Sequence, residues 1–266
     1  RFGLPIAFDP ATNTIHFTPG IVCERSSRRT KEEMAFYIGE PGASTDSPAI
    51  YSMYRNVRRE SDDAVIADAG LRYDITILLP GVFAGERKEY FRTAGHYHPV
   101  KPGVACAYPE VYEVISGRAH WLVQRPHPTD ASRVEEIYAI EAGPGEKAVM
   151  LPGFGHMMVN VGREPLITVN WIGLFAYDYE PYRRLRGSGY WAITGLEQDS
   201  IEFLKNPNYA GVPELKRLQP RELPEFGLTL NTPCYSLARN LTKLDFLLNP
   251  EHYADSLTVE KCFKPA

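Results

Sequence analysis

The chain has 266 residues, 44% of them hydrophobic, and a formal net charge of −4. This length suits one domain with additions. This acidic net charge argues against a nucleic-acid-binding protein, which would have a strongly basic composition. No run approaches the ~18 consecutive apolar residues of a membrane span, and no amino-terminal signal pattern is present. We therefore expect a cytoplasmic protein with no nucleic-acid or membrane partner.

Cysteines and basic pairs give little functional signal. Arg28-Arg29 and Arg183-Arg184 are too short to follow a polyanion; each pair could hold one phosphate, but a solvated role is favoured. The four cysteines are scattered without CxxC spacing, which argues against a disulfide framework or a thiolate zinc site. They are Cys23, Cys106, Cys234 and Cys262.

Residues 1–46 are expected to form an arm of strands and one short helix that packs on the rest of the chain. The helix is predicted over residues 30–37, where Thr30 is a possible N-cap. Glu33 follows three residues later, as in a capping box.

Residues 47–180 read as strand after strand. Short apolar or alternating runs are separated by turns rich in proline and glycine, and this spacing indicates an antiparallel sandwich or barrel. The predicted strands are 49–54, 73–79, 110–115, 119–124, 134–140, 146–151 and 156–161.

Residues 181–266 are expected to form a helical and irregular extension. Helices are predicted over 196–205 and about 236–247 from their apolar spacing. The proline-rich stretch 206–235 is expected to wrap the core without regular structure.

The strongest chemical signal is Gly95-His96-Tyr97-His98. Residues i and i+2 of a strand point to the same face, so His96 and His98 face one side and Tyr97 the other. Two imidazoles side by side form half a metal site. The alternative to metal binding is that both are partly buried structural histidines.

Glu110 opens the strand 110–115, and we expect that strand to form a hairpin with the histidine segment through the loop 99–109. Glu110 shares a face with Tyr112, whereas Glu113 lies on the opposite face. Glu110 is therefore the candidate ligand, and Glu113 is interpreted as a solvated carboxylate.

A third imidazole comes from His156, which follows a turn and shares a face with Met158 and Asn160. Three imidazoles and one carboxylate suit iron, manganese, nickel, zinc or cobalt. Other coordination positions would stay open to substrate. The remaining histidines are interpreted as structural or surface residues: His16, His120, His127 and His252.

This pattern resembles the cupin superfamily. Glu110-x6-Gly117 fits the second half of its first motif, and Gly145-x6-Pro152 with His156-x3-Asn160 fits its second motif. The departure is the gap of eleven residues between His98 and Glu110. The resemblance implies an all-β, jelly-roll-like antiparallel barrel with a few flanking helices and a C-terminal extension.

Within that superfamily, the chain is similar to the cupin-type glucose-6-phosphate isomerases found mainly in archaea. Four segments occur in the same order as in that family. They are Ser27-Arg28-Arg29, Leu79-Pro80-Gly81, the GHYH segment with its lengthened loop, and Val159-Asn160-Val161-Gly162. The resemblance covers roughly residues 1–180. It implies a homodimer that isomerises a sugar phosphate with one divalent transition metal per subunit.

Site residues carry over from that resemblance position by position. The implied metal ligands are His96, His98, Glu110 and His156. The implied substrate contacts are Thr76, Thr93, Gly95, Tyr112 and Tyr179. Two positions depart from the family, because Tyr177 replaces a histidine and Ile172-Gly173 stands where the family has a tyrosine. These changes leave the exact sugar open.

The expected reaction moves hydrogen between C1 and C2 of an open-chain sugar. Glu110 could shuttle the proton through a cis-enediol, whereas a metal-assisted hydride shift would leave Glu110 as a ligand only. Thr76, Thr93 and the Gly95 amide could donate hydrogen bonds to phosphate, although threonines in strands are common for β-propensity alone.

Two other functions compete with glucose 6-phosphate isomerisation. One is a cupin metal dioxygenase, since the ligand set also suits oxygen chemistry. The other is a non-catalytic sugar-binding cupin, in which the two altered positions have removed activity.

Overall fold

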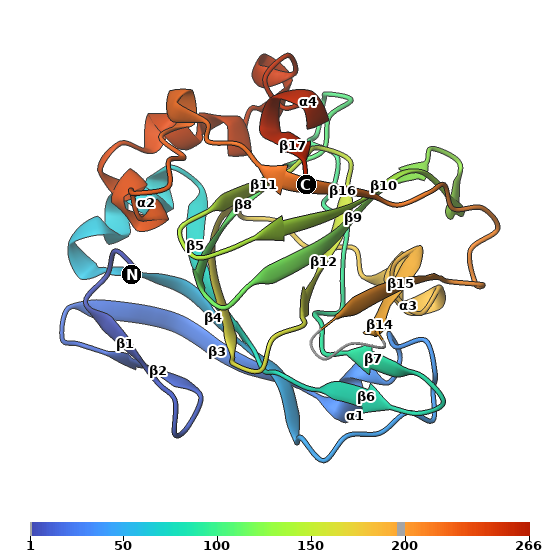
Figure 1. The fold of residues 1–266 in the computed structure, drawn as a ribbon. Helices are drawn as coiled ribbons and strands as arrows, with labels where there is room; N and C mark the ends of the chain where they lie inside the picture. Colours follow the sequence, from blue (N-terminus) through green and yellow to red (C-terminus); the bar gives the residue numbers. More distant parts are fainter. Residues whose placement is uncertain (1, 196–199) are drawn as a thin grey trace.

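The computed structural model describes residues 2–195 and 200–266. Two large β-sheets face each other, and smaller strands and short helices surround them (Figure 1). The larger sheet has the strand order β11-β8-β13-β5-β4-β3 and the other β12-β9-β10-β16-β17. Neither order closes on itself. The all-β, jelly-roll-like cupin fold is therefore confirmed as an open double sheet, with mostly antiparallel pairs.

The larger sheet forms one wall of the molecule, and its antiparallel register sets Asp74 beside Asn170 and Asn170 beside Tyr112. Its strands are β3 (Ile21–Thr30), β4 (Ala49–Arg59), β5 (Leu71–Leu78), β8 (Glu110–Ser116), β11 (Lys147–Met150) and β13 (Leu166–Gly173).

The second sheet faces the first, and the remaining strands form two smaller sheets. It contains β9 (Ala119–His127), β10 (Asp130–Ala142), β12 (Gly155–Asn160), β16 (Lys216–Pro220) and β17 (Phe263–Pro265). A four-stranded sheet contains β6 (Val82–Ala84), β7 (Lys88–Tyr90), β14 (Tyr190–Thr194) and β15 (Ile201–Lys205), and a hairpin contains β1 (Ile6–Asp9) and β2 (Thr14–Phe17).

Helices are short. The α-helices are α1 (Lys31–Met34), α2 (Asp63–Asp68), α3 (Glu180–Arg184) and α4 (Val259–Cys262). The 3-10 helices are η1 (Glu60–Asp62), η2 (Pro224–Phe226), η3 (Cys234–Arg239), η4 (Leu241–Leu247) and η5 (Pro250–Tyr253). No helix of the described residues has the length and hydropathy that a membrane crossing requires.

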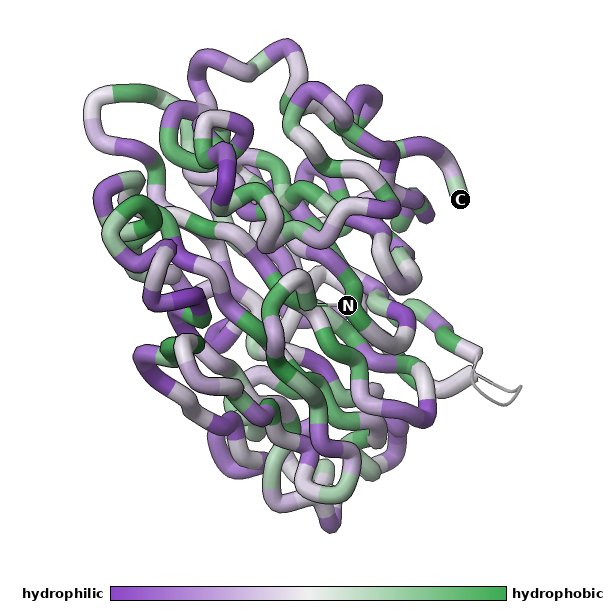
Figure 2. Tube along the Cα trace, turned by 90° about the vertical axis from the view of Figure 1, so that its left-hand side faces the viewer, coloured by the Kyte–Doolittle hydropathy of each residue, from purple (hydrophilic) through white to green (hydrophobic). Residues whose placement is uncertain are grey.

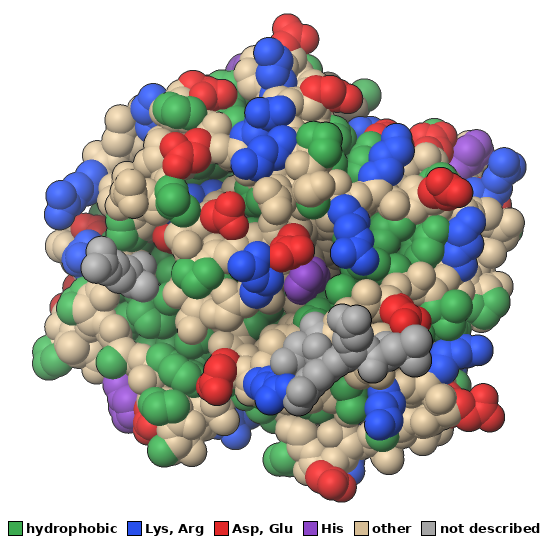
Figure 3. All heavy atoms as spheres, in the orientation of Figure 1, with side chains coloured by type: hydrophobic (Ala, Val, Ile, Leu, Met, Phe, Trp, Pro, Cys, Tyr) green, Lys and Arg blue, Asp and Glu red, His purple; other side chains and the backbone are tan. Residues whose placement is uncertain are grey.

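All seven predicted strands of the central segment are confirmed, with small shifts at their ends. They form because apolar residues of adjacent strands pack on both faces of the larger sheet: the fully buried Trp121 lies beside Tyr112 between the sheets, and the fully buried Trp171 packs against Tyr235 on the outer face. In Figure 2 the hydrophobic stretches run through the middle of the molecule and the hydrophilic ones through its outer loops. Acidic and basic side chains are interspersed over the face shown in Figure 3.

The helix predicted near residue 30 is confirmed as α1, although it ends at Met34. Its capping box is formed: the Thr30 hydroxyl accepts from the Glu33 amide at 3.4 Å, and the Glu33 carboxylate accepts from the Thr30 amide at 2.9 Å. The four cysteines are free, as expected.

The helix predicted over 196–205 is wrong in its described part. Residues 196–199 lie outside the described chain, and Ile201–Lys205 form β15, paired with β14. Ile201 and Phe203 alternate toward the core, which is the period of a strand. Tertiary pairing therefore decides this segment.

Two further predictions for the C-terminal part need correction. Residues 236–247 are helical but not one helix: η3 and η4 are separated at Asn240, whose φ of −151° is not helical. The stretch 206–235 is not wholly irregular, because β16 pairs with β10 in parallel. The division into 1–46, 47–180 and 181–266 stays a prediction.

The predicted hairpin between the histidine segment and β8 is wrong. His96 pairs with His156 of β12, with reciprocal backbone hydrogen bonds of 3.1 Å. Strand β8 pairs instead with β11 and β13 in the other sheet. The loop 99–109 therefore crosses from one sheet to the other, which explains its length.

Glu113 is not solvated, contrary to the sequence interpretation. Its side chain is 5% exposed, lies 3.3 Å from the Lys147 ammonium and accepts from the Cys234 amide at 2.6 Å. The C-terminal segment covers this outer face of β8. Sequence periodicity places Glu113 outward but carries no information about what covers it.

Candidate metal centre

His96 and His98 project from the segment that runs along β12. Both imidazoles face the space between the sheets, while Tyr97 points away and its hydroxyl accepts from the Gln124 amide at 2.7 Å. The expected alternation is thus confirmed, although the segment is held by isolated bridges rather than a regular strand. Gly95 precedes the pair with a φ of +80°, a region that favours glycine.

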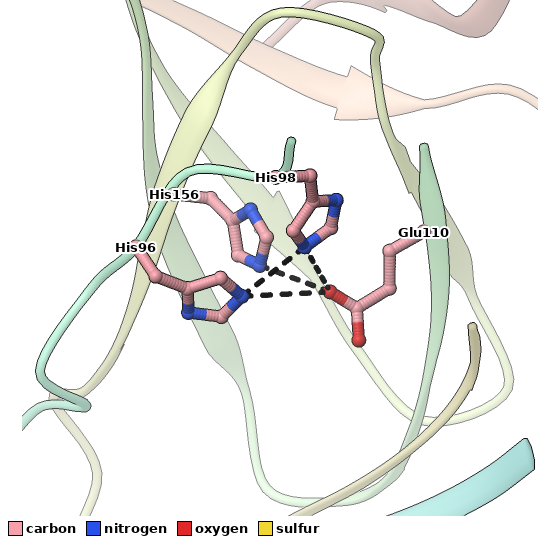
Figure 4. Close-up of side chains that lie close together, drawn as sticks. All are labelled: His96, His98, Glu110 and His156. Atoms are coloured by element: carbon pink, nitrogen blue, oxygen red, sulfur yellow. Dashed lines mark hydrogen bonds and ion pairs between the residues drawn. The ribbon is translucent and has the colours of Figure 1, made fainter. Parts of the chain in front are cut away.

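Glu110 and His156 come from opposite sheets. Glu110 is the first residue of β8, and His156 is the second residue of β12. Figure 4 shows the three imidazoles converging on the Glu110 carboxylate. One candidate ligand atom from each of the four residues lies within 4.8 Å of the others.

The distances between these atoms fit four donors that share one cation. Glu110 Oε2 lies 3.3 Å from His98 Nε2, 3.2 Å from His156 Nε2 and 4.0 Å from His96 Nε2. His96 Nε2 and His98 Nε2 are 3.2 Å apart. Donors that share one ion at about 2.1 Å are separated by about 3 to 4 Å. The four residues can therefore hold one transition-metal ion.

Hydrogen bonds fix the orientation of the donors. His98 Nδ1 lies 2.8 Å from the Tyr108 carbonyl oxygen, which can only accept. The proton of a neutral His98 is therefore on Nδ1, and the lone pair of Nε2 faces Glu110. Glu110 Oε2 is buried without a hydrogen-bond partner among the described residues. Two facing lone-pair atoms are costly unless a cation lies between them.

The protonation of the cluster also favours a cation. Burial, with the charges of His156 and His98, lowers the pKa of His96 well below its ordinary value. Burial also lowers the pKa of His156. Neutral imidazoles and an ionised carboxylate are the forms that bind metal.

Asn170 positions the carboxylate. Its side-chain amide, buried in β13, donates to Glu110 Oε1 at 2.6 Å and leaves Oε2 directed at the histidines. On the far side of His156, the Tyr112 hydroxyl lies 3.4 Å from Nε2. Burial raises the pKa of Tyr112 well above its ordinary value, so its hydroxyl keeps its proton.

The residues carried over as substrate contacts line one cavity beside this cluster. The structure brings together all five of them, Thr76, Thr93, Gly95, Tyr112 and Tyr179, with His96 and His156. Thr93 Oγ1 accepts from the Met158 amide at 2.9 Å, which leaves its own proton available for a ligand.

The altered positions have different surroundings. Ile172 is fully buried in β13, whereas Tyr177 lines the cavity and lies over His96, with ring centroids 4.1 Å apart. The Tyr177 hydroxyl accepts from Arg72. Tyr177 therefore covers the candidate ligand His96 where this imidazole lines the cavity.

Sequence reasoning missed a charged group in the cavity wall. Arg55 lines the cavity, and Arg55 Nη1 donates to Asp74 Oδ2 at 2.6 Å. Arg72 Nε donates to the same oxygen at 2.9 Å. The available signal was alternation, because Tyr51, Met53 and Arg55 share one face of β4. Arg29 was interpreted as solvated, yet it is half-buried over the Tyr179 ring.

The cavity encloses about 40 Å³. That is room for about three water molecules, so a six-carbon sugar phosphate enters only if the wall moves. Tyr177 and Tyr179 lie on the segment between β13 and α3, whose residues 174, 176 and 178 are exposed.

Comparisons with known proteins agree with this geometry. A family model described as glucose-6-phosphate isomerase (GPI) matches residues 27–206. The glucose-6-phosphate isomerase of Thermococcus kodakarensis is 26% identical over 68% of this chain and 86% of its own length. That of Pyrococcus abyssi is 24% identical over 76% of this chain and 97% of its own length.

Among solved structures, a recombinant oxalate oxidase in complex with glycolate is 16% identical over 51% of this chain and 56% of that chain. The TM-score is 0.32, too low to bear on function. The family match, by contrast, spans about two thirds of the chain and includes all four candidate ligands. The chain belongs to the glucose-6-phosphate isomerase family.

Proposed function

We propose that the protein is a metal-dependent aldose–ketose isomerase that interconverts glucose 6-phosphate and fructose 6-phosphate. The observation that carries the proposal is the cluster of His96, His98, Glu110 and His156, two of whose imidazoles, His96 and His156, line a cavity that also holds hydroxyl and amide donors. Membership of the isomerase family supports the reaction. Similar proteins from two archaea carry the same enzyme name.

The four-residue cluster would hold one divalent transition metal, and iron, manganese, nickel and zinc all suit three imidazoles and a carboxylate. When bound, such an ion polarises the neighbouring oxygens of a sugar and stabilises negative charge that develops on them. The chain supplies the donors and orients them through the Asn170 side chain and the Tyr108 carbonyl.

Glu110 is the proposed proton shuttle. In the direction from fructose 6-phosphate to glucose 6-phosphate, the carboxylate would take a proton from C1, the C1–H electron pair would form the C1=C2 double bond, and the C2 carbonyl pair would move to O2, which takes up a proton to give a cis-enediol. Glu110 would then return its proton to C2. The O1 hydroxyl would lose its proton as C1 becomes the aldehyde, which balances the proton gained by O2. One carboxylate suffices because both carbons are adjacent on the same face.

A hydride shift is the competing route, and it needs no base. The two routes differ in the fate of the hydrogen. We expect solvent deuterium at C2 of glucose 6-phosphate formed in D2O, because a proton on Glu110 can exchange with solvent. Complete retention of the substrate hydrogen would reduce Glu110 to a ligand.

The test of the proposed function starts from protein stripped with a chelator. Conversion of fructose 6-phosphate is followed before and after adding back iron, manganese, nickel or zinc. We expect turnover to return with metal in the wild type and to be absent in His96→Ala. His127→Ala, at the end of β9 and outside the cluster, is the matched control. Metal binding without turnover of this sugar would contradict the proposed substrate.

Two parts of the proposal rest on the family resemblance. Tyr177 in place of a histidine favours testing other sugar phosphates in parallel, because this residue covers the cavity. The protein is proposed to be a homodimer. In support, β3 ends the strand order of the larger sheet, and such an edge can pair with a second copy. Sedimentation velocity measures the assembly directly.

A further inference from the structure

The cavity wall holds one positive charge in excess of what its own carboxylate can neutralise. Asp74 is fully buried, and its Oδ2 accepts from both Arg55 and Arg72. Its Oδ1 accepts from the Asn56 amide at 2.9 Å, and this amide carries no charge. Two guanidinium groups share a single negative charge, and the group carries a net charge of about +1.

Only one of these two arginines reaches the cavity. Arg55 lines it together with Tyr51, Met53 and Tyr177, whereas Arg72 is not among the lining residues and donates to the back of Tyr177. The side chain of Arg55 is 17% exposed, so its charge is poorly screened by water.

Arg55 also has hydrogen-bond donors to offer. Its Nη1 is engaged by Asp74, but its Nη2 contacts the Met53 sulfur at 3.0 Å. A thioether is a weak acceptor, and an oxyanion that reached Nη2 would replace it favourably. The fork of a guanidinium matches the oxygens of a phosphate, which a lysine does not.

Arg29 is the weaker candidate for the same role. It lies beyond Tyr179, 5.8 Å from the ring centroid, and outside the lining of the cavity. Arg29 already forms an ion pair with Glu33, whose carboxylate is 3.1 Å from Nη1. Arg29 therefore has less unbalanced charge and no direct access.

We propose that Arg55 determines specificity by binding the phosphate of the substrate, and that this contact makes the site select phosphorylated over neutral sugars. The inference rests on the proposed function for the identity of the ligand. Thr76, Thr93 and Gly95 line the same small cavity and can add neutral hydrogen bonds. They cannot supply the charge that separates a phosphorylated sugar from its neutral counterpart.

The test measures binding of fructose 6-phosphate, fructose and inorganic phosphate to the metal-loaded protein by ligand-observed NMR titration. We expect Arg55→Met to weaken binding of fructose 6-phosphate about tenfold to a hundredfold, the range of a lost charged hydrogen bond. Binding of fructose should stay within about twofold, because it carries no phosphate to lose.

Arg72→Met is the matched control, since it breaks an ion pair to the same Asp74 oxygen without removing a lining residue. It should keep the preference for the phosphorylated sugar. Arg55→Lys keeps the charge beside Asp74 and guards against misfolding of the methionine variant. It should still bind fructose 6-phosphate several-fold more weakly, because an ammonium lacks the fork.

The outcomes separate the inference from the proposed reaction. Wild-type binding of fructose 6-phosphate by Arg55→Lys, or equal loss of preference in Arg72→Met and Arg55→Met, would overturn the role of Arg55. So would a wild type that binds fructose and fructose 6-phosphate equally well. Binding that depends on Arg55 without any turnover would support this inference and contradict the isomerase.

Discussion

At the scale of single residues, the centre depends on how its donors are held. Glu110 offers two oxygens, and Asn170 takes one of them at 2.6 Å, so only Oε2 faces the imidazoles. His98 is held in the same way by the Tyr108 carbonyl. Groups that orient metal ligands in this manner typically change affinity by about 10- to 100-fold when they are removed.

Asn170→Ala should therefore weaken metal binding by about 10- to 100-fold while all four ligands remain. The measurement is a competition titration of the stripped protein against a chromogenic chelator. Asn160→Ala is the control, because Asn160 is equally buried but donates to the Leu78 and Glu164 carbonyls. It should lose stability and keep its metal affinity. An unchanged affinity in Asn170→Ala would refute the orienting role.

Gly95 is the second residue on which the histidine pair depends. Its φ is +80°, and an added Cβ would lie 2.5 Å from Cδ1 of Tyr182. Gly95→Ala should cost more than the ~1–2 kcal/mol of left-handed strain alone, and it should displace His96. Gly103→Ala isolates the strain, because Gly103 has a φ of +84° and open space around it. Urea unfolding of both variants measures the difference, and equal losses would remove the crowding argument.

At the scale of elements, one face of β8 contributes residues to the candidate site, and the other face packs against the C-terminal segment. Tyr112 lines the cavity and Glu110 faces the three imidazoles, while Glu113 points outward into a buried ion pair with Lys147. The same carboxylate accepts from the Cys234 amide, at the start of η3. Strand β8 thus links the C-terminal segment to the sheet that carries the candidate metal ligand Glu110.

Lys147→Met should destabilise the fold by about 3–5 kcal/mol near pH 8, because it leaves Glu113 buried and unpaired. Burial raises the pKa of Glu113 and Lys147 opposes this effect. Without Lys147 the pKa of Glu113 rises further in the folded protein, so folding is accompanied by proton uptake. The loss of stability therefore becomes smaller as the pH falls toward the range where Glu113 is protonated.

Urea unfolding at pH 8 and pH 5.5 measures that dependence. The double variant Lys147→Met with Glu113→Gln removes both charges and should recover much of the loss. A penalty that is the same at both pH values would show that the uncompensated charge is not its cause.

At the scale of the whole molecule, the C-terminal segment and the larger sheet share one core. Tyr235 is fully buried against Tyr73 and Trp171, with ring centroids 5.0 and 6.0 Å apart. The Trp171 indole donates to the Cys234 carbonyl at 2.8 Å. These contacts join residues more than sixty positions apart, so the two parts should unfold together.

Tyr235→Ala should cost about 3–5 kcal/mol, as large-to-small changes of buried aromatics do. Unfolding should remain a single transition. Tyr235→Phe keeps the packing and loses only the hydroxyl contacts to Asp62 and the Arg59 amide, so its cost should be near 1 kcal/mol per contact. Calorimetry that resolved two transitions would contradict the shared core and favour a separable extension.

The sequence by itself determined the features that follow from local spacing. Alternation predicted the central strands, and the i, i+2 rule placed His96 and His98 on one face with Tyr97 on the other. The capping box at Thr30 and the motif residues Glu110 and His156 were also readable, because each needs only neighbours within a few positions.

Only the tertiary structure decided what depends on contacts between distant segments. Sheet register brought Asn170 to Glu110 and placed Arg55, Asp74 and Arg72 around one oxygen. Pairing with β14 made residues 201–205 a strand, and a segment some 120 positions away buried Glu113. Local periodicity states which way a side chain points. What it meets there depends on packing across the whole chain, which periodicity does not contain.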